Sequence, residues 1–340
     1  MRLLQASAVL STILGLVASV SAHAGTLETV KARGILVCGV NVGVQGFSTP
    51  DAKGIYHGLD VDYCRALAAA TLGDPNKVRY VSTSYLTRFV AVQSGEVDVL
   101  ARNVTITMGR ETNLGLVGVA VDFYDGQGFM VPVKMNIDSA KKLDGATVCV
   151  LSGSTSEVNL ADFVRRQGIK IEPILLDSMD TMGSAYQSGR CDAMTTDASQ
   201  LAVLRVSKMQ DPATQVILPE RISKEPLGPF VRQGDEPWQM IAKWTFAALV
   251  AAEELGVTQA NVDQMHDSKD PDIRRLLGTE PGLGKSLGLD EAWASNAIKA
   301  VGNYGEMFER NLGKGSDIGL PRGLNDLWTK GGLMYAEPLR

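Results

Sequence analysis

The feature of this sequence that most constrains its fold is a strand–helix pattern that occurs twice. Short apolar runs, which are typical of buried parallel strands, alternate with helical segments. In the first half the predicted strands are 35–40, 78–81 and 97–100, and the predicted helices are 63–70 and 88–94. In the second half the strands are 146–151, 171–175 and 191–196, and the helices are 156–167 and 182–188. This order favours an α/β fold in which each half forms an open, mostly parallel sheet flanked by helices.

A phrase shared by the two halves supports the duplication. Residues 93–100 read QSGEVDVL, and residues 187–194 read QSGRCDAM. In both phrases a glycine ends a helix and precedes a strand that carries an aspartate. We therefore predict two lobes of similar architecture.

The predicted lobes are discontinuous in the sequence. Roughly 315 residues follow a leader segment, which is more than one compact core usually holds. We expect lobe 1 to combine residues 25–131 with 226–340, including a glycine-rich C-terminal extension, and lobe 2 to be formed by 132–225. Two hinge strands would join the lobes, with crossings near Met130–Lys134 and Leu218–Pro229.

The first 24 residues have the pattern of a secretory signal peptide. Arg2 supplies a positive start, residues 8–20 are apolar without an acid, and Ala22-His23-Ala24 resembles a cleavage site. A membrane anchor is the alternative, but the apolar stretch is shorter than the ~20 residues that a spanning helix needs. We expect cleavage near Gly25 and a mature protein in the periplasm of a Gram-negative bacterium.

Charge and histidine content exclude several classes of function. The formal net charge is −5, and the basic residues are scattered, which gives no footprint for nucleic acid. Of the three histidines, His23 leaves with the signal peptide, and His57 and His266 have no ligand spacing or nucleophile motif beside them. We expect no metal, no cofactor and no catalytic triad.

The four cysteines are Cys38, Cys64, Cys149 and Cys191. In an exported chain an even count favours disulfides, although sequence alone permits three pairings. Their order along the chain suggests Cys38–Cys64 and Cys149–Cys191, each closing a loop within one lobe. Buried free thiols are the alternative, and the absence of a CxxC spacing argues against a redox or zinc motif.

Three polar stretches directly follow predicted strands, at the ends where open α/β sheets collect ligands. The first, VLARNVTITMGRET, could form a small carboxylate cradle from Thr105, Thr107 and Arg110. The second, residues 151–157, presents small hydroxyl residues at a helix start, which suits an anion. The third, residues 195–198, lies at the end of the last strand of the second half and contains Asp197. Each stretch also has an ordinary explanation, because arginines are often solvated and Ser, Thr and Asp often cap helices.

Taken together, the three stretches match the two charges of a zwitterion. Arg110 offers two parallel N–H donors to a carboxylate, which a lysine would match poorly. Asp197 offers an acceptor to an ammonium group. One lobe would hold the negative end of an α-amino acid, and the other lobe would hold the positive end.

Several motifs carry a family resemblance over most of the chain, including the C-terminal extension. They read RNVTITMGRET, YDGQGFMV, DGATVCVLSGSTSE, GRCDAMTTDAS and VILPERISKEPLGPFVRQGD. The chain resembles the general L-amino-acid binding proteins of polar amino-acid ABC uptake systems, which are periplasmic receptors of solute-binding protein family 3. The resemblance implies a two-lobed, type II-like fold that closes on its ligand and delivers it to a membrane permease. A monomer is expected.

The resemblance also implies roles for individual residues. Arg110 would bind the α-carboxylate, helped by Thr105 and by donors at the helix start Ser154–Thr155. Asp197 would bind the α-ammonium, helped by the Asn103 carbonyl. A ligand bonded to both lobes makes more contacts in the closed state and therefore shifts the protein towards closure.

The side-chain end of the expected ligand site departs from narrower relatives. Where these often have an acidic residue and an aromatic, this chain has Asn41 and Val44. Tyr85 would stack on the ligand or would be an exposed tyrosine at a helix start. Arg88 would reach the side-chain pocket and favour acidic or amide ligands, or would form a surface salt bridge. Ile106 replaces an aromatic residue of the close relatives.

Three other functions are considered. Some relatives with this fold are periplasmic dehydratases, but the three stretches show no spare carboxylate or histidine for a general acid. A receptor-kinase or channel module is disfavoured because no transmembrane segment follows the leader. A phosphate or sugar receptor is disfavoured because Asp197 suits a cation and aromatic platforms are few.

Overall fold

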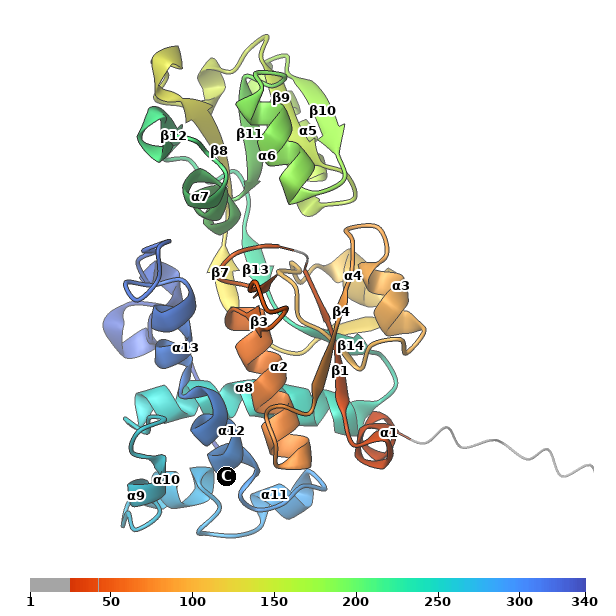
Figure 1. Cartoon of the computed structure of the whole chain (residues 1–340), viewed down its shortest axis with the longest axis vertical. Helices are drawn as coiled ribbons and strands as arrows, with labels where there is room; N and C mark the ends of the chain where they lie inside the picture. The colour runs from red at the N-terminus through yellow and green to blue at the C-terminus, as the bar shows by residue number, and fades with distance from the viewer. Residues whose placement is uncertain (1–24, 42) are drawn as a thin grey trace, which may run out of the picture.

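The computed structural model describes residues 25–41 and 43–340, so the predicted signal peptide lies outside it. Two lobes are joined by a narrow connection made of strands β7 (Phe123–Asp125) and β13 (Glu225–Leu227) (Figure 1). Within the described ranges, no helix is both long and apolar enough to cross a membrane.

The lower lobe of Figure 1 is built on a sheet of order β4-β1-β5-β14-β6. Its strands are β1 (Leu36–Val40), β4 (Val78–Ser82), β5 (Val99–Leu100), β6 (Leu116–Gly118) and β14 (Phe230–Arg232). β1 is parallel to β4 and β5, whereas β14 is antiparallel to β5 and β6. β14 therefore runs against the other strands of its sheet.

The upper lobe repeats this arrangement in a sheet of order β10-β9-β11-β8-β12. Its strands are β8 (Gln127–Pro132), β9 (Thr147–Leu151), β10 (Glu172–Leu176), β11 (Ala193–Asp197) and β12 (Gln215–Ile217). β9 is parallel to β10 and β11, whereas β8 is antiparallel to β11 and β12. The predicted two-lobed fold with mostly parallel sheets is confirmed.

The reversed strand of each sheet is the first strand after the chain changes lobes: β8 follows β7, and β14 follows β13. The prediction placed the first crossing near Met130–Lys134 and ended the first part of lobe 1 at residue 131. This boundary differs from the strand pairing, because β8 belongs to the upper sheet and the chain therefore changes sheets before Gln127. The sequence does not reveal this because β8 pairs with strands remote from it in the chain.

Helices flank both sheets. In the upper lobe they are α5 (Thr155–Gln167), α6 (Met179–Gln187) and α7 (Ala198–Ser207). In the lower lobe, helices before the crossing are α1 (Thr26–Arg33), α2 (Leu59–Leu72), α3 (Arg88–Gln93) and α4 (Met108–Asn113). A small hairpin of β2 (Thr49–Pro50) and β3 (Tyr56–His57) precedes α2.

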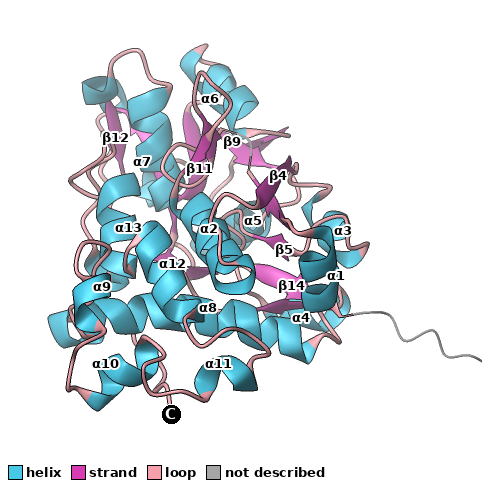
Figure 2. Ribbon diagram, turned by 60° about the horizontal axis from the view of Figure 1, so that its bottom comes forward, coloured by secondary structure: helices cyan, strands magenta, loops and turns pink. Residues whose placement is uncertain are grey.

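Helices after the return to the lower lobe gather around α8, as Figure 2 shows. They are α8 (Glu236–Glu254), α9 (Val262–Met265), α10 (Pro271–Leu276), α11 (Leu283–Ser286), α12 (Trp293–Val301) and α13 (Tyr304–Asn311). Short 3₁₀ turns lie at Val133–Met135, Ala140–Lys142, Pro212–Thr214, Gly323–Asn325 and Trp328–Lys330.

The start of α2 has no side-chain cap. Asp60 and Asp62 are residues of a type that often caps helices, but the N-cap is Gly58, and α2 begins at Leu59. The two acids lie in the first turn and bind elsewhere. Asp62 accepts a hydrogen bond from Arg310 at 2.6 Å, and Asp60 accepts one from the backbone N–H of Asn103.

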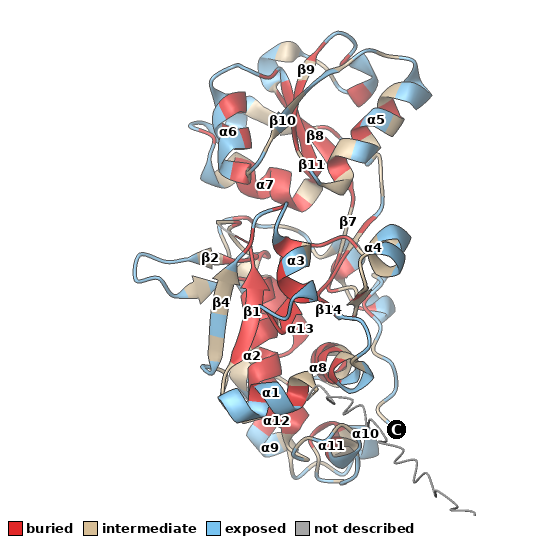
Figure 3. Cartoon of the chain, turned by 90° about the vertical axis from the view of Figure 1, so that its right-hand side faces the viewer, coloured by how far each residue is buried: buried red, intermediate tan, exposed pale blue. Residues whose placement is uncertain are grey.

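Strand β1 shows why the central strands read as continuous apolar runs. All five of its residues are buried, with Leu36 and Cys38 in the cluster that faces α2 and Val37 in a cluster on the other face. Figure 3 shows such buried strands at the centre of both lobes. Because helices cover both faces of the sheet, hydrophobic burial does not alternate along the strand.

The C-terminal extension contacts the hinge. The Tyr304 hydroxyl donates to the carbonyl of Asp122 at 2.9 Å. The side chain of Asn325 accepts from the backbone N–H of Tyr124 at 2.6 Å and donates to its carbonyl at 3.1 Å. Phe308 stacks on Phe123. Because β13 pairs with one edge of β7, the extension supplies the contacts on the other side of this hinge strand.

Both expected disulfides are present. Cys38 in β1 is bonded to Cys64 in α2, with 6.3 Å between their Cα atoms. Cys149 in β9 is bonded to Cys191, just before β11, with a Cα separation of 5.6 Å. Each bridge lies within one lobe and closes a local loop.

Reduction of the two bridges should lower the melting temperature. Restriction of the unfolded chain by each disulfide contributes ~3–4 kcal/mol. The loss of both should lower the melting temperature on the order of 10 °C. Calorimetry with and without reductant measures this shift. An unchanged melt, together with four titratable thiols in the native protein, would refute the bridges.

Candidate functional site

A polar cleft lies where the two sheets face each other across the hinge. Its lining comes from the end of β11 and from the segments that follow β4, β5, β9 and β11, the strand ends at which ligands collect in α/β sheets. These residues are Tyr85, Arg88, Asn103, Thr105, Arg110, Ser154, Thr155, Ser156, Thr196, Asp197 and Gln200. The two halves of the chain therefore contribute side chains to one site.

The loop after β5 carries the lower wall of the cleft. Asn103 has a φ of 55°, a conformation that asparagine adopts more readily than most residues. This backbone lets its N–H reach Asp60, and within the described chain its side-chain amide has no hydrogen-bond partner. The following residues pair with the return strand, because the N–H of Ile106 donates to the carbonyl of Pro226 at 2.7 Å.

Arg110 lies in α4, whose N-cap is Thr107. Its Nη1 donates to the carbonyl of Thr105 at 2.6 Å, and its guanidinium packs on the ring of Phe89. Burial lowers the pKa of Arg110, and the carboxylates of Glu225 and Asp197 oppose this shift. Arg110 is therefore a half-buried cleft residue, and the solvated alternative does not hold.

The N-terminus of α5 forms part of the upper wall. Ser154 caps this helix by accepting from the N–H of Glu157, and its own hydroxyl donates to the carbonyl of Leu151 at 2.6 Å. The Thr155 hydroxyl donates to Glu225 at 2.9 Å. The first backbone N–H groups of a helix are an anion-binding feature, and here they lie in the lining of the cleft.

Asp197 occupies the N-cap position of α7, but its side chain makes no capping hydrogen bond. Instead its Oδ2 accepts from Nε2 of Gln200 at 2.8 Å, and among the described residues its Oδ1 has no partner. Burial raises the pKa of Asp197 well above its usual range, and the carboxylates of Asp125 and Glu225 raise it further. The site thus holds an acceptor that an added cation would stabilise.

Tyr85 packs against two guanidinium groups. Arg88 and Arg102 lie 4.8 and 4.6 Å from the centre of its ring. Arg88 is 2% exposed, its Nη2 donates to the carbonyl of Gly153 at 3.1 Å, and no ion pair to it is found in the described chain. The surface explanations for Tyr85 and Arg88 therefore fail, because both side chains are buried against the cleft.

The lobes touch directly across the cleft. The Tyr85 hydroxyl donates to Oε1 of Gln200 at 3.4 Å, and the hydroxyls of Thr105 and Thr155 lie 3.4 Å apart. With the bond from Arg88 to the upper lobe, these contacts define a closed arrangement.

Asn41 lies outside the lining of the cleft. Its Oδ1 accepts from Nη2 of Arg102 at 2.9 Å, behind Tyr85. Ile106 is also absent from the lining, because its side chain packs towards Gly118 and the opposite face of the lower sheet. Thr107, expected in the carboxylate cradle, is absent from the lining too, because its side chain caps α4 by accepting from the N–H of Arg110. The remaining residues predicted to bind ligand all line the cleft.

One cleft residue, Gln200, was not predicted from the sequence, whereas Ser156 and Thr196 lie in the predicted polar stretches but had no assigned role. Gln200 lies one helical turn after Asp197, a spacing that could have indicated a shared face. Arg102 and Glu225 were also missed, and both are buried beside the cleft. Glu225 follows no recognisable pattern, because it lies in a short, proline-containing return segment.

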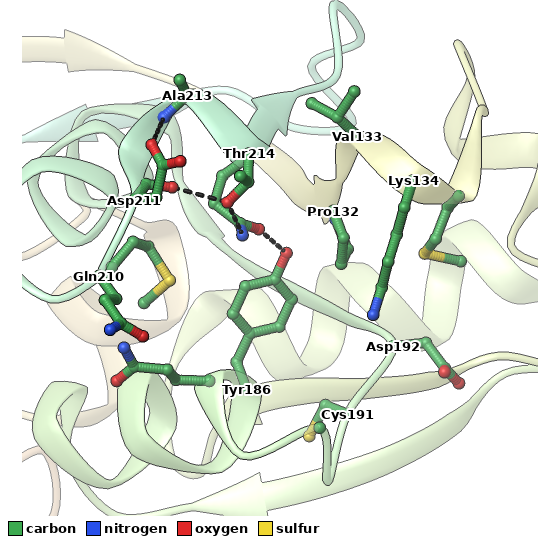
Figure 4. Close-up of a pocket in the computed structure, with 15 residues that line it drawn as sticks. Pro132, Val133, Lys134, Tyr186, Cys191, Asp192, Gln210, Asp211, Ala213 and Thr214 are labelled. Carbon is green, nitrogen blue, oxygen red and sulfur yellow. Dashed lines mark hydrogen bonds between the residues drawn. The ribbon is translucent and has the colours of Figure 1, made fainter.

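A second hollow, in the upper lobe, holds none of the residues predicted to bind ligand (Figure 4). It lies beside the end of β8 and the turn at Pro212–Thr214. Several of its polar groups are paired within the protein: Tyr186 donates to Gln215 at 2.5 Å, and Thr214 donates to the carbonyl of Asp211 at 2.6 Å. The cleft between the lobes is therefore the candidate site.

A two-lobed fold with a polar cleft at its hinge defines a binding protein of the periplasmic type. A model of the bacterial extracellular solute-binding proteins, family 3, matches residues 36–261. The chain belongs to this family. The expected family resemblance is thereby confirmed.

Similar proteins extend the match to the C-terminal extension. The chain is 52% identical to the general L-amino acid-binding periplasmic protein AapJ of Rhizobium johnstonii over 322 residues, covering 94% of each chain. It is 54% identical to the glutamate/glutamine/aspartate/asparagine-binding protein BztA of Rhodobacter capsulatus, covering 94% of this chain and 95% of that one. A solved periplasmic binding protein from Brucella ovis with glutathione bound is 52% identical, with a TM-score of 0.91, covering 94% of this chain and all of that one.

Proposed function

We propose that this protein is a periplasmic receptor that binds an L-α-amino acid between its lobes and delivers it to the permease of an ABC importer. The observation that carries the proposal is the placement of Arg110 and Asp197 on opposite lobes of one cleft. Neither side chain forms an ion pair with another described residue. A zwitterion would neutralise both charges at once, and it would do so only when the lobes are closed.

The two ends of the ligand have matching partners. Arg110 and the N-terminus of α5 offer donors to the α-carboxylate. Asp197 and the Asn103 carbonyl offer acceptors to the α-ammonium. These assignments rest on the burial of Arg110 and Asp197 and on the absence of an ion pair to either side chain within the described chain. A buried charge without a partner is costly.

Positive charge in excess around Tyr85 favours an acidic or amide side chain. Arg88, Arg102 and Arg110 lie near this ring or the cleft, and Nε of both Arg88 and Arg102 lacks a partner within the described chain. A ligand carboxylate or amide oxygen next to Arg88 would supply an acceptor. The name of the Rhodobacter relative, which binds glutamate, glutamine, aspartate and asparagine, agrees with this preference.

A thermal-shift screen followed by calorimetry tests the function. The panel should contain the twenty L-amino acids, D-glutamate, 2-hydroxyglutarate and glutathione, because a solved relative has glutathione bound. We expect the largest shifts from acidic and amide L-amino acids, with micromolar or tighter Kd, or about −8 kcal/mol and better. Loss of binding on replacing the ammonium by a hydroxyl is expected too. A panel without any shift would refute the receptor function.

A lyase on the same fold is the alternative. It would need a free general acid near the leaving group. Glu225 is a carboxylate beside the cleft, but it already accepts hydrogen bonds from Thr105 and Thr155. We expect no turnover of prephenate or arogenate by the purified protein, and turnover would reverse this proposal. We also propose a monomer, which light scattering tests.

Ligand affinity should depend on pH through Asp197. Burial and the neighbouring Asp125 and Glu225 raise its pKa, whereas Arg110 and Arg88 oppose the shift. A bound ammonium would lower this pKa, so binding should release a proton below the pKa of the free protein. Kd should therefore fall as pH rises and level off above that pKa. Calorimetry in buffers of different ionisation enthalpy measures the proton release, and buffer-independent heats at acidic pH would contradict it.

A further inference from the structure

The most highly connected carboxylate beside the cleft is Glu225, in hinge strand β13. It is 1% exposed and lies opposite Asp125 in the register of β7 and β13. Four side chains donate hydrogen bonds to its carboxylate: Thr105 at 2.5 Å, Thr155 at 2.9 Å, Asn159 at 2.7 Å and Ser223 at 2.5 Å.

The donors come from both lobes. Thr105 belongs to the lower lobe, whereas Thr155 and Asn159 lie in α5 of the upper lobe. A carboxylate without an ion pair in the described chain needs hydrogen bonds to offset its burial. Opening the hinge would separate Glu225 from the donors of at least one lobe. The closed arrangement is therefore the one in which this carboxylate is fully satisfied.

Glu225 also determines what the two threonines offer to a ligand. A hydroxyl has a single proton to donate and two lone pairs that accept. Thr105 and Thr155 both direct that proton to Oε2 of Glu225. Their remaining lone pairs can only accept. This differs from the donor role expected for Thr105 towards the α-carboxylate, and it suits an ammonium group instead.

We propose that Glu225 is an interlobe latch and a positioning residue: it ties both lobes together in the closed form, and it makes the hydroxyls of Thr105 and Thr155 acceptors for the ligand. The latch involves groups of the protein only, so it does not depend on which ligand is bound. The positioning role rests on the function proposed above.

The test compares Glu225→Gln and Asn159→Ala with the control Glu220→Gln. Glu220 lies in the same return segment but bonds within the upper lobe, to the N–H of Ala140. Small-angle scattering without added ligand gives the radius of gyration, and calorimetry with L-glutamate and L-glutamine gives Kd. We expect Glu225→Gln to have a larger radius without ligand, to recover the wild-type radius at saturation and to raise Kd about tenfold or more.

Asn159→Ala should change both quantities in the same direction by less, because it removes one of the four bonds and leaves the buried carboxylate in place. Glu220→Gln should match the wild type. If Glu225→Gln and Asn159→Ala keep the wild-type radius, the latch is refuted, even if the melting temperature falls. Should wild-type protein bind no amino acid, the proposed function fails, but the scattering comparison still decides the latch.

A double-mutant cycle tests the positioning role. Thr105→Val should raise Kd about tenfold in the wild-type background and less than about twofold in the Glu225→Gln background, because the hydroxyl would act through the carboxylate. Equal effects in the two backgrounds would show that Thr105 acts independently and would overturn the positioning role. If Glu225 has only a structural role, Glu225→Gln should lower stability but leave the effect of Thr105→Val on Kd unchanged.

Discussion

Replacing Arg110 with alanine should abolish measurable binding of every amino acid. Removing one partner of a buried, hydrogen-bonded charge pair typically costs about 2–5 kcal/mol. The middle of this range corresponds to an increase in Kd of at least ~100-fold. Arg110→Lys should recover little, because an ammonium group cannot form the two parallel hydrogen bonds that a guanidinium makes to a carboxylate. Calorimetry with the tightest ligand of the wild-type protein measures both variants.

The fold should survive this change. Arg110 is half-buried in a short helix, and its guanidinium donates to the nearby Thr105 carbonyl. The melting temperature of the Arg110→Ala protein without ligand should stay close to that of the wild type. Arg190→Ala, at an exposed arginine before β11, is the matched control and should bind normally. Wild-type affinity in Arg110→Ala would remove the carboxylate assignment.

The substitution Asp197→Asn should affect binding and stability in opposite directions. Ligand affinity should fall by at least ~100-fold, because the ammonium would lose its charged partner in a buried site. The protein without ligand should become more stable at neutral pH. A carboxyl group whose pKa is raised on folding is destabilising above its unfolded pKa, and the amide removes that penalty. The Asn side chain can still accept from Gln200.

These opposite signs separate a binding role from a structural one. A cap or a core hydrogen bond would give lower stability in the variant, with any loss of affinity following from it. Asp180→Asn, at an exposed aspartate paired with Lys208, is the control and should leave affinity unchanged. Differential scanning calorimetry and titration calorimetry on the same samples give both quantities. Normal affinity in Asp197→Asn would refute the proposal that Asp197 binds the α-ammonium group of the ligand.

The predictable part of the site consists of residues whose role follows from position along one strand and its loop. Arg110, Ser154 and Asp197 each follow a recognisable apolar strand, and parallel strands bring their carboxyl ends to one edge. The cysteine pairing was predictable in the same way, since each bridge closes a loop within one lobe. Local order in the chain was sufficient for these features.

Residues that depend on pairing between remote segments were not predictable. Arg102 and Asn103 are neighbours in the sequence, but Arg102 packs behind Tyr85 whereas Asn103 lines the cleft. The left-handed backbone of Asn103 determines that difference. Asn41 was expected at the ligand, and the buried guanidinium of Arg102 draws its amide away from the cleft.

By itself, the sequence determined the two repeated α/β units, the strand ends that carry polar groups and the opposite charges at two of those ends. Hydrophobic periodicity and loop composition encode these features locally. Tertiary structure alone decided which strand of each sheet runs antiparallel to the others and how the C-terminal extension contacts β7. It also decided that Glu225 accepts hydrogen bonds from both lobes. Those outcomes depend on contacts between segments far apart in the chain, and such contacts arise only when the hinge strands pair.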